Sequence, residues 1–143
     1  MIRWSEEEVA ARDAVRAFVE KEIRPRQDDL EHRGVPPYDV IRSLFAAFGL
    51  GEMSAESFDR QIAAIEKGEE PRAGSGRDLG LSSVLNIELA KVSMGITSAL
   101  GVSVGLAAGT INARGTVEQR KRWARDLLTF DKIGAWAITE PDS

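Results

Sequence analysis

Apolar residues recur at helical spacing along most of the chain, and the pattern starts near the N-terminus. Ser5 and Glu8 have the spacing of a capping box, in which each side chain binds the backbone N–H of the other residue. The apolar positions that follow repeat every three or four residues and stop at Pro25, because proline disrupts a helix interior. This pattern predicts a first amphipathic helix followed by a polar turn.

Two further helices are expected before residue 68. One follows Pro36-Pro37, carries an apolar stripe and ends at Gly49, a residue type that commonly terminates helices. The other is expected to begin with Ser54 as its N-cap and to stop at Gly68. Both have their apolar residues on one face, which indicates packing against a common core.

The stretch from Gly68 to Asp78 is rich in glycine and charged residues, so we expect a loop there. It contains Gly74-Ser75-Gly76, a small glycine motif of the kind that can cradle phosphate. No strand precedes this motif and no Lys-Ser/Thr pair follows it, as a P-loop requires. A flexible surface connection is therefore the favoured interpretation.

The segment from Leu81 to Asn112 is the most apolar part of the chain and predicts one long helix or a helix pair. It has no charged residue after Lys91, and Gly101, Gly105 and Gly109 form a ridge of small residues. Such a segment is long enough to cross a bilayer. Six Ser, Thr and Asn side chains interrupt it and no aromatic belt flanks it, which favours a wholly buried helix in a soluble bundle.

The period of the pattern changes near the C-terminus. Thr116 and Gln119 form a second capping box and start a last helix. From Ile133 to Thr139 the side chains alternate as in a strand that ends at Pro141. Because a single strand has no ladder partner, the chain is interpreted as the front part of a larger protein. We predict an all-helical domain over residues 1–131 and the start of a β domain over residues 132–143.

Composition excludes several classes of function. The net charge of −4 gives no general attraction to nucleic acid or anionic lipid, and the basic run 120–122 is expected to be a solvated helix face. The absence of cysteine excludes disulfides, thiol catalysis and Cys-ligated metals. The acidic N-terminus does not resemble a targeting segment, so a cytoplasmic location is expected.

The residues by themselves show no catalytic constellation. His32 is the single histidine and is expected in an exposed turn, with no arrangement that suggests a triad. The clustered carboxylates lie at expected helix ends and loops, where solvation is the favoured interpretation rather than acid–base or metal chemistry. They are Asp28, Asp29, Glu31, Glu66, Glu69 and Glu70. We therefore predict no catalytic residue and no metal site in this chain.

The last thirty residues carry a specific resemblance. The run GTVEQRKRW at 115–123, followed by KIGAWAITEP at 132–141, closely resembles acyl-CoA dehydrogenases, in which a GT-x-EQ-K helix start leads to a strand ending in A-x-T-E-P. Upstream, residues 88–91 match the E-L-A element that begins a long central helix of that family. The Arg24-Pro25 ending of the first helix is also similar to the family's opening helix.

The resemblance implies an N-terminal all-helical domain followed by the first strand of a middle β domain. Members of that family bind FAD and oxidise the Cα–Cβ bond of an acyl-CoA thioester to 2-enoyl-CoA. The family's base is a carboxylate, usually a Glu of a C-terminal helical domain, which is expected outside this chain. The resemblance also implies an electron-transfer flavoprotein or a similar acceptor as a partner, and a homo-oligomer such as a tetramer.

The family's A-x-T-E-P strand end contacts the flavin, so Trp136, Ile138 and Thr139 are the implied cofactor-binding residues. A Thr139 hydroxyl at the pyrimidine edge of the ring would stabilise the negative charge of the reduced flavin. Ordinary strand packing is the alternative role of Trp136 and Ile138. Glu140-Pro141 is expected to shape the turn that follows rather than to react.

The family's central helix lines the acyl pocket. With the E-L-A elements aligned, Thr97, Ser98, Gly101 and Gly105 are the implied substrate-binding residues. The absent side chains of the two glycines would leave room for a long or bulky acyl group. Close packing of another helix on the same glycines is an equally good interpretation.

The chain departs from the family pattern after Gly49. The family's Pro-Glu-x-x-Gly-Gly segment is replaced by a sequence that leads into the third predicted helix, so the substrate subgroup is left open. A second hypothesis for the whole chain is a stand-alone helical interaction module whose terminal strand pairs with a partner. A gene that continues into a Gly-Ser-Asp motif and a helical domain would favour the enzyme.

Overall fold

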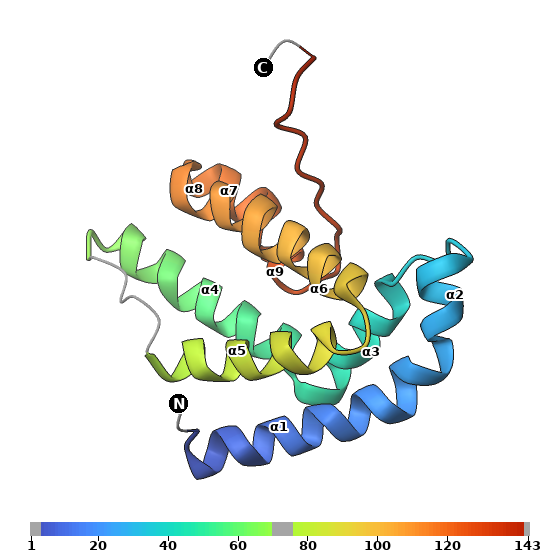
Figure 1. Ribbon diagram of the computed structural model, residues 1–143. Coiled ribbons are helices and arrows are strands. Elements are labelled where there is room, and N and C mark those ends of the chain that lie inside the picture. The colour runs from blue at the N-terminus through green and yellow to red at the C-terminus, as the bar shows by residue number, and fades with distance from the viewer. Residues whose placement is uncertain (1–3, 70–75, 142–143) are drawn as a thin grey trace. The chain divides into compact units, whose positions relative to one another are not determined.

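The computed structural model describes residues 4–69 and 76–141. Within these residues every regular element is helical, which confirms the predicted all-α class (Figure 1). The chain divides into two compact units. The first consists of residues 1–40 and 72–98, and the second of residues 41–71 and 99–143.

The first unit starts with helix α1 (Glu6–Phe18), which begins where the sequence predicts. The Ser5 hydroxyl accepts from the backbone N–H of Glu8 at 3.2 Å, and the Glu8 carboxylate accepts from the N–H of Ser5 at 2.6 Å. This capping box satisfies two N–H groups that a helix start leaves without intrahelical partners.

The prediction that this helix ends at Pro25 was wrong. The chain continues through the π-helical turn η1 (Val19–Ile23), the 3₁₀ turn η2 (Arg24–Arg26) and helix α2 (Gln27–His32). Pro25 lies in the first positions of η2, where a missing N–H costs nothing because that group has no helical acceptor. The expected polar turn is therefore largely helical, and His32 is an exposed residue at the end of α2.

Helix α5 (Gly76–Ala90) packs against α1. Of the two alternatives left by the sequence, one long helix or a helix pair, the structure has the pair, because the chain breaks at residues 91–93 before α6 (Met94–Leu100) begins. The Gln27 amide donates to the Val92 carbonyl at 2.7 Å, and the Ser93 hydroxyl donates to the Glu31 carboxylate, so α2 holds this break. Residues 76–78 of the expected loop belong to α5, whereas Gly74 and Ser75 lie outside the described residues.

The second unit contains most of α3 (Tyr38–Phe48) and all of α4 (Leu50–Glu66). Gly49 separates them with a φ of 62°, a left-handed conformation that glycine adopts readily, as its predicted stop role requires. The prediction that Ser54 caps the next helix was wrong, because α4 starts directly after Gly49. Gly68 ends the α4 region with a φ of 75°, as predicted.

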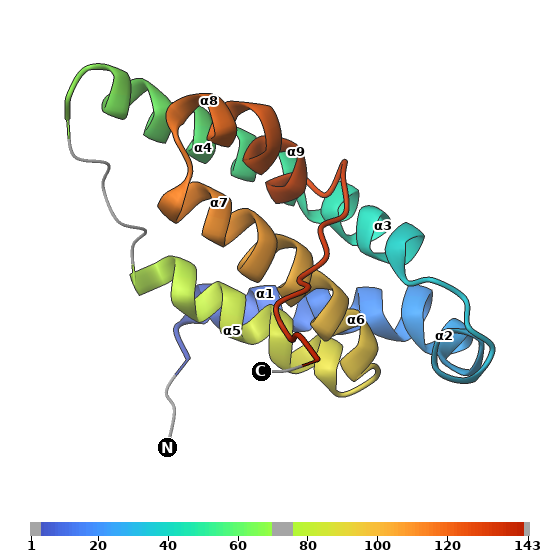
Figure 2. The same cartoon turned by 90° about the horizontal axis from the view of Figure 1, so that it is seen from above.

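The rest of this unit is a helical hairpin. Its elements are η3 (Gly101–Ala108), α7 (Gly109–Arg114), α8 (Val117–Gln119), η4 (Arg120–Ala124) and α9 (Arg125–Leu128). The predicted Thr116–Gln119 capping box is present at the start of α8. Helix α4 packs against α9, and α7 packs against η4 (Figure 2).

The hydrophobic core of the second unit gathers around α4 and the hairpin. Phe58 and Ile62 of α4 pack with the fully buried Ala124 of η4. Burying a Phe or Ile side chain contributes about 1.5–3 kcal/mol, so these contacts stabilise the unit more than its exposed ion pairs do. Those pairs, such as Lys121 with Glu66 at 2.5 Å, lie along the same helices.

The helix from Met94 to Arg114 is long and apolar enough to cross a membrane by length and composition, but the expectation that it is wholly buried was wrong. In the structure 28% of its apolar window is buried. Ala108 is fully buried, whereas the side chain of Leu106 is 47% exposed. One side of the helix therefore packs in the core and another side faces open space.

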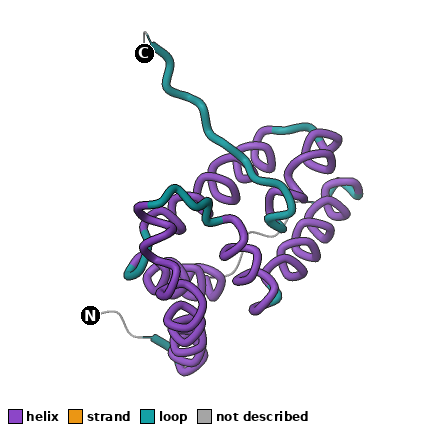
Figure 3. Tube along the Cα trace, turned by 90° about the vertical axis from the view of Figure 1, so that its right-hand side faces the viewer, coloured by secondary structure: helices purple, strands orange, loops and turns teal. Residues whose placement is uncertain are grey.

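The predicted strand at the C-terminus does not form in the described residues. Residues 134–140 carry no regular secondary structure and leave the helices as a loop (Figure 3). A strand requires a ladder partner, and the described chain offers none. The alternating side chains are present in this segment, but no sheet among the described residues pairs with its backbone N–H and C=O groups.

Candidate functional site

The helix from Met94 to Arg114 carries all four predicted substrate residues. The Thr97 hydroxyl donates to the Ser93 carbonyl at 3.3 Å and its side chain is half-buried, whereas Ser98 is exposed. Gly101 and Gly105 lie one turn apart in η3 and both are exposed. A Cβ added at either glycine would meet no described atom within 4 Å. Within the second unit, no described helix therefore packs closely on this pair of glycines.

The predicted cofactor residues lie together on the segment after α9. The side chains of Trp136 and Ile138 are 37% and 66% exposed, and Thr139 is also exposed. Among residues 4–69 and 76–141, no group bonds the Thr139 hydroxyl. The segment thus presents a free hydroxyl and free backbone groups next to apolar side chains. An isoalloxazine ring requires these two kinds of contact, so the residues fit one edge of a flavin site.

The structure joins the segments that carry the two predicted sets, through two residues that belong to neither set. The backbone N–H of Gly134 donates to the Ser103 hydroxyl at 2.9 Å, which places the start of the cofactor segment against η3. Gly101 and Gly105 belong to the same turns of η3, within the second unit. Thr97 and Ser98 belong to the first unit. The sequence contained no signal for Ser103, which is one of several hydroxyl residues in an apolar helix.

A buried charge that sequence reasoning did not identify lies in the first unit. Glu88 of α5 is 3% exposed, and its carboxylate accepts two bonds from the Arg16 guanidinium, both of 3.0 Å. Lys91 donates to the same carboxylate at 2.6 Å. The spacing of Glu88 and Lys91 predicts their contact, but nothing in the sequence indicated Arg16.

These contacts control the protonation of Glu88. The hydrogen bonds from Arg16, opposed by burial and assisted by Lys91, lower the pKa of Glu88 from 4.5 to about 2. A carboxylate held this strongly as an anion does not exchange protons near neutral pH. Its environment is that of a structural ion pair rather than a general base.

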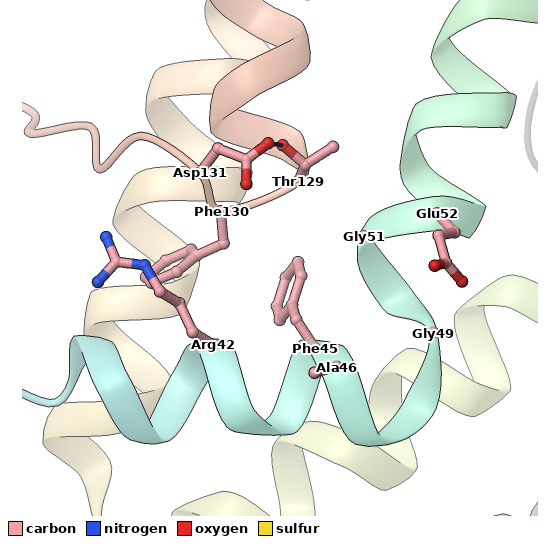
Figure 4. Close-up of a pocket in the computed structure, with 9 residues that line it drawn as sticks. All are labelled: Arg42, Phe45, Ala46, Gly49, Gly51, Glu52, Thr129, Phe130 and Asp131. Atoms are coloured by element: carbon pink, nitrogen blue, oxygen red, sulfur yellow. Dashed lines mark hydrogen bonds between the residues drawn. The ribbon is translucent and has the colours of Figure 1, made fainter.

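A cavity of about 260 Å³ lies in the second unit, between α3, the start of α4 and the residues after α9 (Figure 4). The rings of Phe45 and Phe130 face each other there with centroids 5.5 Å apart. Arg42, Glu52 and Asp131 add charges of both signs around these rings. This volume is below the range of common ligand pockets, and the mixed charges select no ligand class.

The backbone of the cavity carries local strain. Phe130 has a φ of 63°, a left-handed conformation that is uncommon for a bulky residue, yet its side chain is 1% exposed. Burial of its ring against Phe45 offsets the strain. The cavity adjoins Gly49 and Gly51, where the sequence departs from the pattern of the acyl-CoA dehydrogenases.

The single histidine and the clustered carboxylates of the sequence form no catalytic or metal site among the described residues. His32 is an exposed side chain whose Nδ1 lies 3.4 Å from a carboxylate oxygen of Asp28. Within the described part of the chain, no group of three His, Asp or Glu side chains is arranged to hold a metal ion. The carboxylates of Asp28 and Glu66 pair with exposed Arg33 and Lys121, which agrees with their predicted solvation.

Comparison with known proteins identifies the family of this arrangement. The family model for the N-terminal domain of acyl-CoA dehydrogenases matches residues 5–131. A short-chain specific acyl-CoA dehydrogenase from Megasphaera elsdenii is 32% identical over 88% of this chain and 30% of the relative. An acyl-CoA dehydrogenase from Bacillus subtilis is 27% identical over 97% of the chain and 33% of that protein.

A further relative differs in its described activity. The caffeyl-CoA reductase–Etf complex subunit CarC from Acetobacterium woodii is 28% identical over 96% of the chain and 33% of its own length. The chain thus spans about a third of the length of these curated relatives. No solved structure matches the chain significantly.

Proposed function

Because this chain belongs to the acyl-CoA dehydrogenase family through its N-terminal domain, we propose that it forms the helical front part of an FAD-dependent acyl-CoA dehydrogenase. The reaction is oxidation of the Cα–Cβ bond of an acyl-CoA thioester to 2-enoyl-CoA. The match of the family's N-terminal domain to residues 5–131 carries this proposal. Since the chain covers about a third of its relatives, the catalytic base and most of the cofactor site would be supplied by other residues.

In this proposal the segment 134–140 supplies one edge of the flavin site. Bound FAD accepts the hydride and supplies the redox chemistry, while the protein contributes position and electrostatics. Trp136 and Ile138 would contact the ring with apolar surface. The exposed Thr139 hydroxyl would donate a hydrogen bond where negative charge develops on the reduced cofactor.

The helix that carries Gly101 and Gly105 would line the acyl chain, together with Thr97 and Ser98. The support is the open space at both glycines, where an added Cβ meets no described atom within 4 Å. The alternative of close helix packing requires a partner segment that the described residues of the second unit do not supply. A larger side chain at Gly101 would project into the space proposed for the acyl group.

The proposal also includes partners. The name of one relative describes it as a subunit of an Etf complex, which supports an electron-transfer flavoprotein or a similar acceptor for this protein. A homo-oligomer, which the family likeness suggests, and a cytoplasmic location, with which the absence of cysteine is compatible, are further proposals. Neither affects the assignment of residues to the site.

The function is tested with the complete protein, purified with FAD and assayed on acyl-CoA thioesters of increasing chain length. We expect bound FAD and acyl-CoA-dependent reduction of an electron acceptor. In Gly101→Leu the preference is expected to move to shorter acyl groups, with kcat/KM for the longest good substrate lowered at least about 10-fold, because the leucine occupies the acyl space.

Ala113→Leu is the matched control, since it places the same leucine side chain at an exposed position near the end of the same helix. Its chain-length preference is expected to equal that of the unaltered protein. An unchanged preference in Gly101→Leu would refute the acyl-pocket assignment. A complete protein that neither binds FAD nor reacts with any acyl-CoA would favour the alternative of a helical interaction module.

A further inference from the structure

Ser103 differs from the other hydroxyl residues of its helix in its burial. It lies in the π-helical segment η3 and its side chain is 0% exposed. Its hydroxyl accepts a hydrogen bond from the Gly134 N–H at 2.9 Å, across 31 residues of sequence. A buried hydroxyl requires such a partner, and short π-helical segments are frequent at functional sites.

Gly134 is packed too closely on η3 for any other residue type. A Cβ at this position would lie 2.6 Å from the Cβ of Ala107 and 3.3 Å from the Leu127 side chain. Both neighbours are buried, so neither can move aside without disturbing the core cluster that they form. The glycine therefore permits the backbone to lie in direct contact with the helix.

This contact is the point where the C-terminal segment is held. Residues 135–139 form no hydrogen bond with another described residue, and they are exposed. The position of residues 135–139 is consequently set by the direction in which the chain leaves Gly134. Ser103 fixes that direction because it binds the peptide N–H of Gly134 itself.

Ser103 also lies between the two glycines that are exposed on the same helix. Gly101 and Gly105 are each two residues from Ser103, and residues two apart point to different faces of a helix. One face of η3 thus binds the C-terminal segment, while the other faces open space. A single rigid element connects the two predicted parts of the site.

We propose that Ser103 and Gly134 are positioning residues that hold the flavin-contact segment at a fixed place relative to the helix that lines the acyl chain. Through them, η3 sets the distance between the cofactor and the substrate bond. The inference rests on the proposed function, since the flavin and acyl roles come from it. The anchoring of the segment is a physical contact that can be measured without either ligand.

The first experiment measures amide hydrogen exchange in the FAD-free complete protein. In Ser103→Ala the Gly134 amide, which donates to the Ser103 hydroxyl, is expected to exchange about 5-fold faster, the factor that corresponds to one hydrogen bond of about 1 kcal/mol. Ser83→Ala is the matched control, because this exposed serine bonds only a carbonyl of its own helix at 2.7 Å. In this control the exchange of the Gly134 amide is expected to equal that of the unaltered protein.

The second experiment adds FAD to the same proteins. We expect Ser103→Ala to bind FAD about 5- to 10-fold more weakly, to shift the visible absorption of the bound flavin, and to lower kcat while the KM for acyl-CoA stays within about 2-fold. A purely structural serine would leave the spectrum of the bound flavin and the ratio of kcat to KM unaffected. That result, or unchanged amide exchange, overturns the proposal.

A compensating pair tests the close approach independently. Gly134→Ala is expected to cause the same losses, because its Cβ would meet Ala107 at 2.6 Å. Adding Ala107→Gly removes the opposing Cβ and is expected to restore the flavin spectrum and most of the FAD affinity. Ala107→Gly alone controls for the glycine in the helix. Failure of the pair to recover contradicts the role of Gly134.

The two levels of inference fail in different ways. If the unaltered protein binds no FAD, the proposed function falls, and the flavin role of the two residues falls with it. If the unaltered protein binds FAD and oxidises acyl-CoA but Ser103→Ala behaves like Ser83→Ala, the function stands and the positioning role is overturned.

Discussion

Glu88 is a charged residue that is almost fully buried. Its carboxylate is 3% exposed and is held by Arg16 and Lys91. Such a charge is tolerated only when its lone pairs are bonded, and here three donors satisfy them. Replacing Glu88 with glutamine would remove the negative charge and leave the Arg16 and Lys91 cations without their partner. We therefore expect this small substitution to lower the free energy of unfolding markedly.

The pH dependence of stability tests this residue. The pKa of Glu88 falls from an ordinary 4.5 to about 2 in the folded chain. A lowered pKa contributes stability that is full above about pH 4.5 and is lost as pH falls toward 2. We expect denaturant unfolding of Glu88→Gln to show about 2 kcal/mol less stability at pH 7. The variant is also expected to lose less stability than the unaltered protein between pH 5 and 2.5.

Glu56→Gln provides the control for this series. Glu56 is exposed and faces Arg60 at 3.5 Å on the surface of α4. Its replacement is expected to change the free energy of unfolding by less than about 0.5 kcal/mol at pH 7. A Glu88→Gln protein as stable as Glu56→Gln at pH 7 would show that the buried ion pair contributes no net stability.

At the scale of elements, the helix boundaries follow from local backbone chemistry. The Ser5 and Thr116 capping boxes and the glycine stops at Gly49 and Gly68 were all predicted correctly, because a cap or a positive φ needs only neighbouring residues. Pro25 was misjudged because proline is harmless at the start of a new helical turn. Ser54 was misjudged because a left-handed Gly49 lets α4 begin at once.

Gly49 offers a direct test of such a boundary. Its φ of 62° is strained for an L residue with a Cβ, so Gly49→Ala is expected to lower the free energy of unfolding by about 1–2 kcal/mol. Gly51→Ala, two residues on, is the matched control. Its added Cβ would make an ordinary contact of 3.6 Å with the Thr129 carbonyl. Thermal or denaturant unfolding of both variants distinguishes strain from loss of space.

Opposite signs are expected for the two substitutions. Alanine at position 51 lies within α4, where glycine costs up to about 1 kcal/mol relative to alanine, so this variant is expected to be neutral or more stable. If Gly49→Ala and Gly51→Ala lowered the free energy of unfolding equally, steric crowding by the added Cβ, and not the left-handed conformation of residue 49, would explain the loss.

At the scale of the whole molecule, the proposed function gives this chain only one edge of a flavin site. Residues 135–140 are exposed and carry no sheet partner among the described residues. We therefore predict that the 143-residue chain alone neither retains FAD nor oxidises acyl-CoA. The measurement is the flavin absorbance of the purified chain after incubation with excess FAD and desalting, with the complete protein as control. A yellow 143-residue chain active on acyl-CoA would disprove the prediction.

Only part of the candidate site could be predicted from the sequence. The resemblance selected Thr139 and its neighbours, and the structure shows them exposed on one segment, but their flavin contacts stay a prediction. The same holds for Gly101 and Gly105, although the structure shows that the space beside them is open. The hydrogen bond between Ser103 and Gly134 could not be predicted, because no sequence pattern specifies the partner of a hydroxyl in an apolar helix.

Local features of this protein follow from its sequence alone: the helical class, the two capping boxes and the glycine stops. Each depends on interactions among residues close together in the chain. Tertiary structure decided the contacts that join distant residues, namely Arg16 with Glu88 across 72 positions and Gly134 with Ser103 across 31. It also decided the strand, since alternating side chains form one only when a second strand supplies its hydrogen bonds.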